Sequence, residues 1–146
     1  MVHSLALSRE IYVPRELVFD VLTRAEHLEI WYAEIPGRTC DASVDLRTGG
    51  SFRLTWSEPD GAQAQESGTY EHVRVPEEYA GTRRLDLSGA APLQTAFVVR
   101  LAATEGGSAT RIEISEQGFP DAQQRDSAQA RWQARLDRLE SYFSAI

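Results

Sequence analysis

The sequence contains no lysine, so its fifteen basic residues are all arginine, and aspartate and glutamate outnumber them with 22 residues. The formal net charge is −7 at pH 7. A surface of this sign repels the phosphates of nucleic acids and the headgroups of anionic lipids. We therefore expect neither nucleic acid nor a membrane among the partners of this protein.

Cysteine is nearly absent, and long apolar runs are missing. Cys40, the single cysteine, cannot form a disulfide within the chain, so nothing calls for an oxidising compartment. No apolar run approaches the roughly 20 residues that span a bilayer. The start, Met1-Val2-His3-Ser4, lacks the basic residues and apolar core of a secretory signal. Together these absences predict a cytoplasmic protein.

The motifs that usually mark metal, cofactor or nucleophile sites are missing as well. His3, His27 and His72 do not have the spacing of metal ligands. There is no P-loop, no dinucleotide-binding fingerprint and no Gly-x-Ser-x-Gly sequence. We therefore expect no metal and no cofactor, and we assign no catalytic residue.

What is present is the composition of a globular protein. With 146 residues, 42% of them hydrophobic, the chain is expected to form a single α+β domain over residues 1–146. Apolar residues alternate from Leu5 to Val13, which predicts a half-buried strand. Pro14 ends this strand and suits the first turn of a helix. A second short helix is expected from about Ala25 to Tyr32.

The middle of the chain has the pattern of short strands separated by tight turns. Arg47-Thr48-Gly49-Gly50 is typical of a hairpin turn, and Pro76 breaks a strand. The pattern predicts an antiparallel meander. The expected strands lie at about Thr39–Leu46, Ser51–Ser57, Glu66–Val75, Thr82–Leu87, Leu93–Thr104 and Ala109–Ser115.

The last segment, from about Pro120 to Ser144, predicts a long helix with one buried face. At 100° per residue, five apolar residues fall within an arc of about 80°. Gln133, Asp137 and Glu140 fall on the far side. The helix therefore requires an apolar partner, and the sheet is the only one large enough. The stripe consists of Ala128, Trp132, Leu136, Leu139 and Phe143.

Several short motifs accompany this order of one strand, two helices, six strands and a long helix. They are Pro14-Arg15-Glu16-Leu17-Val18-Phe19, His27-Leu28 with Trp31, Asp45-Leu46-Arg47-Thr48-Gly49-Gly50-Ser51-Phe52, Gly68 with Val75-Pro76-Glu77, Gly118-Phe119 and Trp132. Over essentially its whole length the chain resembles the bacterial family similar to the C-terminal domain of the activator of the heat-shock-protein-90 ATPase. That family belongs to the START-like, birch-pollen-allergen superfamily.

The resemblance implies a helix-grip fold. In that fold a seven-stranded curved antiparallel sheet wraps around a long C-terminal helix, two short helices follow the first strand, and a cavity lies between sheet and helix. Members of the superfamily bind lipids and plant hormones, shape polyketide intermediates or act as co-chaperone domains. The resemblance therefore implies a pocket and leaves the activity open.

Strand and helix parity selects the apolar candidates for the lining of such a pocket. An aromatic-rich cavity is the usual form of a small-molecule site. The alternative, which we weight slightly more for any one residue, is that these side chains fill the core. The candidates are Trp31, Phe52, Leu54, Trp56, Phe97, Val99, Ile112, Trp132 and Leu136.

Two arginines are added to the candidates. Arg9 shares the parity of Leu5 and Leu7, and a buried guanidinium requires a carboxylate, a phosphate or a ligand acid. The alternative is that Arg9 reaches solvent or pairs with a structural glutamate. Arg135, at the edge of the helical stripe, either reaches the pocket mouth or lies with its stem along apolar surface.

Tyr70 and His72 share a strand face. If that face points inward, they form a polar pair that can orient a ligand or transfer a proton, because histidine titrates near neutrality. If it points outward, they are surface residues. Val73 competes for the inward parity, so the sequence leaves the choice open.

Three functional hypotheses follow. The leading one is a domain that binds a small apolar or aromatic molecule. The second is an enzyme of cyclase or dehydratase type, which would need Tyr70, His72 or Glu34 inside the cavity. The third is a chaperone-linked module, which we favour less because the resemblance covers only the C-terminal-domain part of the eukaryotic activator. Exposed aromatic residues would equally suit a homodimer surface.

Overall fold

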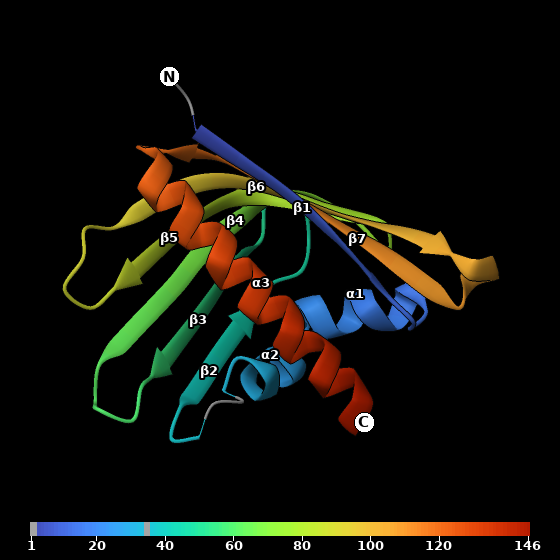
Figure 1. Cartoon of the computed structure of the whole chain (residues 1–146), viewed down its shortest axis with the longest axis horizontal. Coiled ribbons are helices and arrows are strands. Elements are labelled where there is room, and N and C mark those ends of the chain that lie inside the picture. Colours follow the sequence, from blue (N-terminus) through green and yellow to red (C-terminus); the bar gives the residue numbers. More distant parts are fainter. Residues whose placement is uncertain (1–2, 34–35) are drawn as a thin grey trace.

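The computed structural model describes residues 3–33 and 36–146, in which seven strands form one antiparallel sheet (Figure 1). The elements are β1 (His3–Ile11), α1 (Arg15–Thr23), α2 (Ala25–Trp31), β2 (Thr39–Val44), β3 (Ser51–Ser57), β4 (Gln63–Arg74), β5 (Glu78–Leu87), β6 (Leu93–Thr104), the 3-10 turn η1 (Glu105–Gly107), β7 (Ala109–Phe119) and α3 (Ala122–Ala145).

The strands are ordered β1-β7-β6-β5-β4-β3-β2 across the sheet. Strands that follow one another in the chain are neighbours, except that β1 pairs with β7 and so lies at the edge opposite β2. The two short helices carry the chain from one edge to the other. Figure 1 shows α3 lying across one face of the curved sheet, with α1 and α2 beside its C-terminal half. The expected helix-grip fold is confirmed.

The N-terminal elements follow the local sequence signals. On β1, Leu5 and Ile11 are buried, as the alternation predicts. Pro14 precedes α1, where its missing N–H removes no helical hydrogen bond. The extended backbone of Arg24 (φ −83°, ψ 134°) then separates α1 from α2.

Helix α3 begins at a capping residue and buries the predicted stripe. The Asp121 carboxylate accepts a hydrogen bond of 2.8 Å from the backbone N–H three residues later. Two features differ from the prediction: Arg135 is buried, and Tyr142 is buried where Phe143 is half-buried. Tyr142 turns toward α2, where its hydroxyl lies 2.7 Å from Nδ1 of His27. The predicted residues that are buried are Ala128, Trp132, Leu136 and Leu139.

Three strands are longer than the sequence indicated. β4 begins at Gln63 and β7 continues to Phe119. β5 begins at Glu78, four residues before the predicted start, because the residues from Glu78 to Gly81 pair with β6. Pro76 before this segment and Gly81 at its end are of residue types that are typical of turns.

Glycine is required at one position of β4 and one of β5, two steps apart in their ladder. A Cβ atom at Gly68 would lie 2.0 Å from the backbone oxygen of Thr82, and one at Gly81 would lie 1.9 Å from the backbone oxygen of Thr69. Glycine in a strand interior often marks such a close backbone approach. Next to it, the β4–β5 register shifts between Tyr70 and His72, which has consequences for the site.

Candidate ligand-binding site

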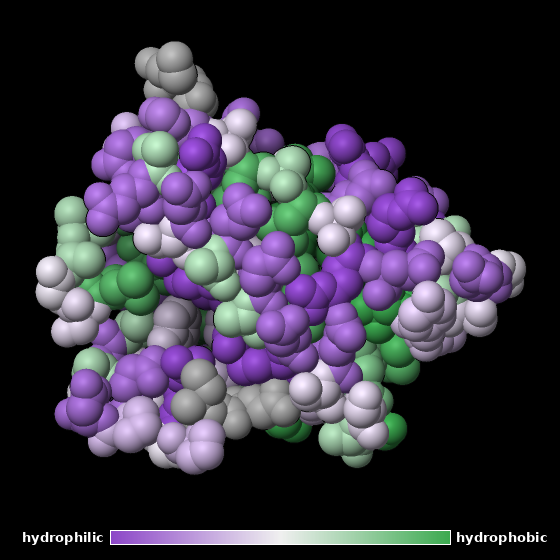
Figure 2. Space-filling model, viewed as in Figure 1, coloured by the Kyte–Doolittle hydropathy of each residue, from purple (hydrophilic) through white to green (hydrophobic). Residues whose placement is uncertain are grey.

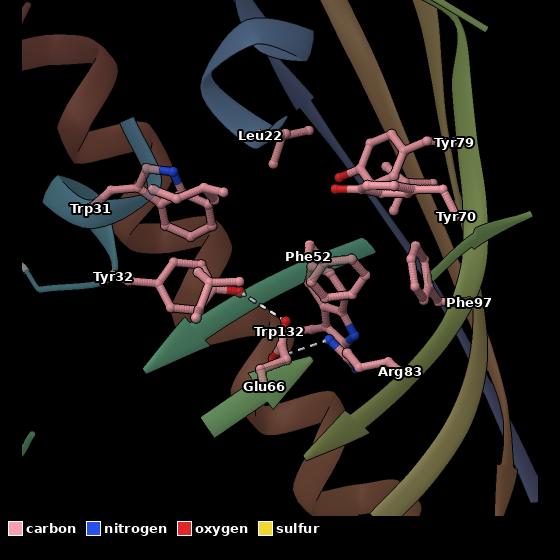
Figure 3. Close-up of a pocket in the computed structure, with 13 residues that line it drawn as sticks. Leu22, Trp31, Tyr32, Phe52, Glu66, Tyr70, Tyr79, Arg83, Phe97 and Trp132 are labelled. Carbon is pink, nitrogen blue, oxygen red and sulfur yellow. Dashed lines mark hydrogen bonds and ion pairs between the residues drawn. The ribbon is translucent and has the colours of Figure 1, made fainter. Parts of the chain in front are cut away.

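A cavity of about 50 Å³ lies between α3, the two short helices and the concave face of the sheet (Figure 3). Figure 2 shows the surface hollowed beside α3, over β3, on the same side of the sheet. The cavity is lined by residues from all of these layers: Leu22, Leu28, Trp31, Tyr32, Phe52, Leu54, Glu66, Tyr70, Tyr79, Arg83, Phe97, Val99 and Trp132.

The sheet side of the cavity is a cluster of aromatic rings. The ring centroids of Phe52 and Tyr70 are 5.2 Å apart, and those of Tyr79 and Phe97 are 6.1 Å apart. These rings come from β3, β4, β5 and β6, at the inward positions of each strand. Strand alternation thus places an apolar wall on the concave face.

One end of the cavity is polar and contains Glu66 of β4. Its carboxylate accepts hydrogen bonds from Arg135 of α3 at 2.9 Å and from the Tyr32 hydroxyl at 3.3 Å, and lies 3.5 Å from Arg83. Burial alone would raise the pKa of this carboxyl, but the charges of Arg135 and Arg83 hold it below its ordinary value. Glu66 is therefore ionised and compensated at neutral pH.

A second buried carboxylate, Glu116 of β7, completes this network. It accepts hydrogen bonds from Arg83, from the Thr95 hydroxyl at 2.5 Å and from the Trp132 indole N–H at 2.8 Å. Arg83 thus links the two carboxylates. With Arg135 the network holds two positive and two negative charges, which balance one another. Half-buried Arg131 of α3 lies outside this network, and burial together with the charges of Arg135 and Arg83 lowers the pKa of its guanidinium.

Tyr70 and Tyr79 carry the other polar atoms of the lining. Both side chains are buried, and their hydroxyls have no hydrogen-bond partner among the residues that the structure describes. Burial raises the pKa of both phenols, so both hydroxyls are protonated at neutral pH. Figure 3 shows the two oxygens pointing away from the sheet into the cavity.

The structure brings seven of the thirteen predicted residues to the cavity and places six elsewhere. Those at the cavity are Trp31, Phe52, Leu54, Tyr70, Phe97, Val99 and Trp132. Those elsewhere are Arg9, Trp56, His72, Ile112, Arg135 and Leu136. Ligand contact by the first group stays a prediction, while the placement of the second group is corrected.

The apolar residues outside the lining belong to the packed core. Trp56 packs against Tyr32, with ring centroids 5.9 Å apart and the ring planes tilted by 60°. Ile112 pairs with Leu101, one inward position beyond the last cavity residue of β6. Leu136 is buried one turn after Trp132. Parity correctly predicted that these side chains point inward. They lie too far along their strands or helix from the cavity residues to reach the cavity.

Both predicted arginines bind carboxylates of the protein. Arg9 faces α3 and donates to Asp137 at 2.6 Å and to Glu140 at 3.1 Å, residues that we had placed on the far side of the helix. It therefore joins β1 to α3 outside the cavity. Arg135 neither lines the cavity nor lies along the surface. Its side chain is buried and donates a hydrogen bond to Glu66. Its guanidinium lies over the ring of Tyr32, 5.0 Å from the ring centroid.

The inward-facing Tyr70–His72 pair, one of the alternatives that the sequence leaves open, does not form. The register shift between them adds one residue to β4, so Val73 rather than His72 lies opposite the cavity residue Tyr79. Such a bulge reverses the side-chain alternation beyond it. Tyr70 consequently points into the cavity, and His72 lies on the convex face, 2.5 Å from the Glu78 carboxylate.

The cluster around Glu78 on the convex face leads to a prediction about stability in acid. Arg74 at 2.8 Å, with Arg100 and His72, outweighs burial and lowers the pKa of Glu78 to about 2. A lowered folded-state pKa contributes stability above the ordinary value of 4.5, and this contribution disappears as the pH falls toward 2. Glu78→Gln should therefore be less stable than the parent at pH 7, with the difference vanishing near pH 2.

Urea denaturation of parent and Glu78→Gln between pH 7 and pH 2.5 measures this difference. The matched control is Glu113→Gln, an exposed residue of β7, whose difference from the parent should change little over the same range. A gap for Glu78→Gln that stays constant with pH would contradict the assignment.

Sequence reasoning did not select six of the lining residues. Glu66 has the parity of Tyr70, and Arg83 that of Leu85, so the same signal that selected Arg9 was present at both. Tyr79 lies between the predicted strands Glu66–Val75 and Thr82–Leu87, so no strand parity was available for it. The six are Leu22, Leu28, Tyr32, Glu66, Tyr79 and Arg83.

Several solved bacterial structures are similar to this chain. One from Rhizobium leguminosarum has a TM-score of 0.83 at 22% identity and covers 100% of this chain and 97% of its own. One from Chromobacterium violaceum has a TM-score of 0.79 at 22% identity, with 96% of each chain covered. One from Nitrosomonas europaea has a TM-score of 0.73 at 28% identity, covering 94% of this chain and 92% of its own. The likenesses at 22% identity establish the fold alone.

No curated protein matches the chain. In the described part of the chain, every helix is too short or too polar to cross a membrane. The sequence pattern of one family, which suggests a ligand-binding or chaperone-associated domain, matches residues 12–144. The chain therefore belongs to the family described as Activator of Hsp90 ATPase homolog 1-like protein.

Proposed function

We propose that this protein binds a small, mostly apolar molecule in the cavity between α3 and the sheet. The observation that carries the proposal is the lining: apart from Glu66 and Arg83, every residue of it is aliphatic or aromatic. Concave, largely apolar sites with a few placed polar groups are the usual form of small-molecule pockets. The two carboxylates and two guanidiniums of the network balance one another, which favours a ligand without net charge.

The size of the cavity indicates how binding occurs. Its volume of about 50 Å³ is well below the roughly 150 Å³ of an apolar cavity that admits benzene. A ligand of that size therefore has to displace side chains of the lining. Among the aromatic lining residues that donate a hydrogen bond, Tyr32 has the longest one, 3.3 Å to Glu66, compared with 3.0 Å for Trp31 and 2.8 Å for Trp132.

The arrangement supports binding rather than acid–base catalysis. The enzyme hypothesis needed Tyr70, His72 or Glu34 inside the cavity. Tyr70 lies there, but His72 lies on the opposite face of the sheet and so cannot act with it. Glu66 is held ionised by two arginines, which makes it a weak base and removes its proton. Glu34, the third residue considered, lies outside the described residues.

Fluorine NMR of protein labelled with 5-fluorotryptophan tests the proposal with a built-in control. Trp31 and Trp132 line the cavity and Trp56 does not. Titration with toluene, a neutral apolar probe, should therefore shift the signals of Trp31 and Trp132 saturably and shift that of Trp56, which touches the lining only through Tyr32, by less. Native mass spectrometry of freshly purified protein would show whether a small molecule is already bound.

A variant that fills the cavity separates internal binding from surface contact. Leu54→Phe adds volume at a buried wall position and should abolish the toluene response. Val99→Leu, on β6 of the same sheet wall, is a smaller addition that serves if Leu54→Phe does not fold. Equal shifts of all three tryptophan signals, or no saturable shift, would refute the proposal and leave a chaperone-associated role as the hypothesis to test.

A further inference from the structure

Tyr70 and Tyr79 present two hydroxyl groups to the cavity that no described residue binds. Buried tyrosine hydroxyls usually have a hydrogen-bond partner. We propose that their partner is the oxygen of a neutral carbonyl compound, whose apolar part occupies the rest of the cavity. This inference rests on the proposed function and specifies the class of ligand.

The two tyrosines are held in a fixed relation by the sheet. They come from adjacent strands on the same face, with Tyr70 opposite Gly81 and Tyr79 opposite Val73. Their rings meet edge to face with centroids 6.2 Å apart. Because Gly81 has no side chain, nothing stands beside Tyr70 at that position of the ladder. In Figure 3 both hydroxyls point toward the side of the cavity formed by Leu22 and Trp31.

The other polar groups of the lining already have partners. The Trp31 indole N–H donates to the backbone oxygen of Val21 at 3.0 Å. The Trp132 indole N–H donates to Glu116 at 2.8 Å, and the Tyr32 hydroxyl donates to Glu66 at 3.3 Å. Among the aromatic side chains of the described lining, the two tyrosine hydroxyls are therefore the donors that remain for a ligand.

The chemistry of the pair selects a carbonyl oxygen. A carbonyl oxygen has two lone pairs and can accept from both hydroxyls at once. A carboxylate would also accept two hydrogen bonds, but burying its charge requires a free cation. Arg83, the cation of the lining, is already bound to Glu116 and lies 3.5 Å from Glu66. A neutral ketone, aldehyde, ester or amide fits without adding charge.

Cyclohexanone and methylenecyclohexane form a matched pair of probes, because the second has nearly the shape of the first and no acceptor oxygen. Their dissociation constants are measured by fluorine NMR titration on the parent and on Tyr70→Phe, Tyr79→Phe and the double variant. In the double variant we expect the cyclohexanone dissociation constant to rise about tenfold or more, since a site that binds a ligand oxygen discriminates by that contact. The constant for methylenecyclohexane should stay the same or fall.

A spectroscopic measurement and a folding control accompany the titration. The carbonyl stretch of bound ¹³C-labelled cyclohexanone should move to lower frequency on the parent and return toward its value in hydrocarbon on the double variant. The Tyr→Phe variants lose no hydrogen bond of the protein, so they should melt at or above the temperature of the parent. Tyr142→Phe, which loses the contact with His27, should melt below it.

The outcomes distinguish the two proposals. If methylenecyclohexane binds and cyclohexanone affinity is the same in parent and double variant, the carbonyl inference is overturned and the apolar cavity function stands. If both probes lose affinity equally in the double variant, the inference is likewise overturned. If neither probe binds the parent, the proposed function fails, and the carbonyl inference fails with it.

Discussion

Replacing Glu66 by glutamine is expected to cost about 3–5 kcal/mol of folding free energy, the typical effect of removing one partner from a buried ion pair. Glu66 is 4% exposed and compensates Arg135 at 2.9 Å and Arg83 at 3.5 Å. Glutamine fills the same space without the charge. It therefore leaves two buried guanidiniums with Glu116 as their single anion within the network.

Urea denaturation at pH 7 measures this loss, and Asp137→Asn is the matched control. Asp137 also binds an arginine, Arg9, at 2.6 Å, but its side chain is 72% exposed. Exposed pairs contribute roughly 1 kcal/mol or less. A Glu66→Gln variant no less stable than Asp137→Asn would contradict the description of the network.

The double substitution Glu66→Leu with Arg135→Met gives a second test. Replacing a buried pair by apolar residues of similar volume is often close to neutral, whereas removing one partner is not. We therefore expect the double variant to be more stable than Glu66→Gln. If it is less stable, charge compensation is not the main contribution of Glu66.

Gly81→Ala is expected to cost about 3 kcal/mol, because overpacking that displaces backbone lies at the upper end of such substitutions. The added methyl group would lie 1.9 Å from the oxygen and 2.9 Å from the carbonyl carbon of Thr69. These are backbone atoms of the neighbouring strand and cannot rotate away. Relief requires the β4–β5 ladder to open beside Tyr70, so the toluene response should weaken as well.

The control is Thr82→Ala at the next position of β5, where the side chain is exposed. It loses a surface hydrogen bond of 3.2 Å between the Thr69 and Thr82 hydroxyls. Surface changes of this kind cost about 0.5 kcal/mol. The denaturation midpoints of Gly81→Ala and Thr82→Ala are compared, and that of Gly81→Ala should be clearly lower. Similar midpoints would mean that the strands can separate at Gly81 at little cost in free energy.

Local patterns were sufficient for most of the fold. The inward alternation of Phe52 and Leu54 on β3, and of Phe97 and Val99 on β6, was read correctly, because a strand side chain has only two directions. The buried stripe of α3 followed from helical periodicity in the same way. Both signals depend on neighbours within a few residues, so a single sequence contains them completely.

The polar part of the site was not accessible to that reasoning. An inward-facing charge such as Glu66 or Arg83 is costly alone, so charged residues are ordinarily assigned to the surface. Their burial depends on partners far along the chain, since Glu66 and Arg135 are separated by 69 positions. The sequence contains the four charges, but their compensation exists only once β4, β5, β7 and α3 are assembled.

The same division applies to Tyr70 and His72. Composition and periodicity indicated the order of the elements, the apolar concave face and the buried face of α3, since these follow from side-chain direction within each element. The family resemblance implied the helix-grip architecture. One inserted residue in β4 then decided which of the two polar side chains enters the cavity. A bulge is set by the pairing of one strand with the next, and pairing is a property of the assembled sheet.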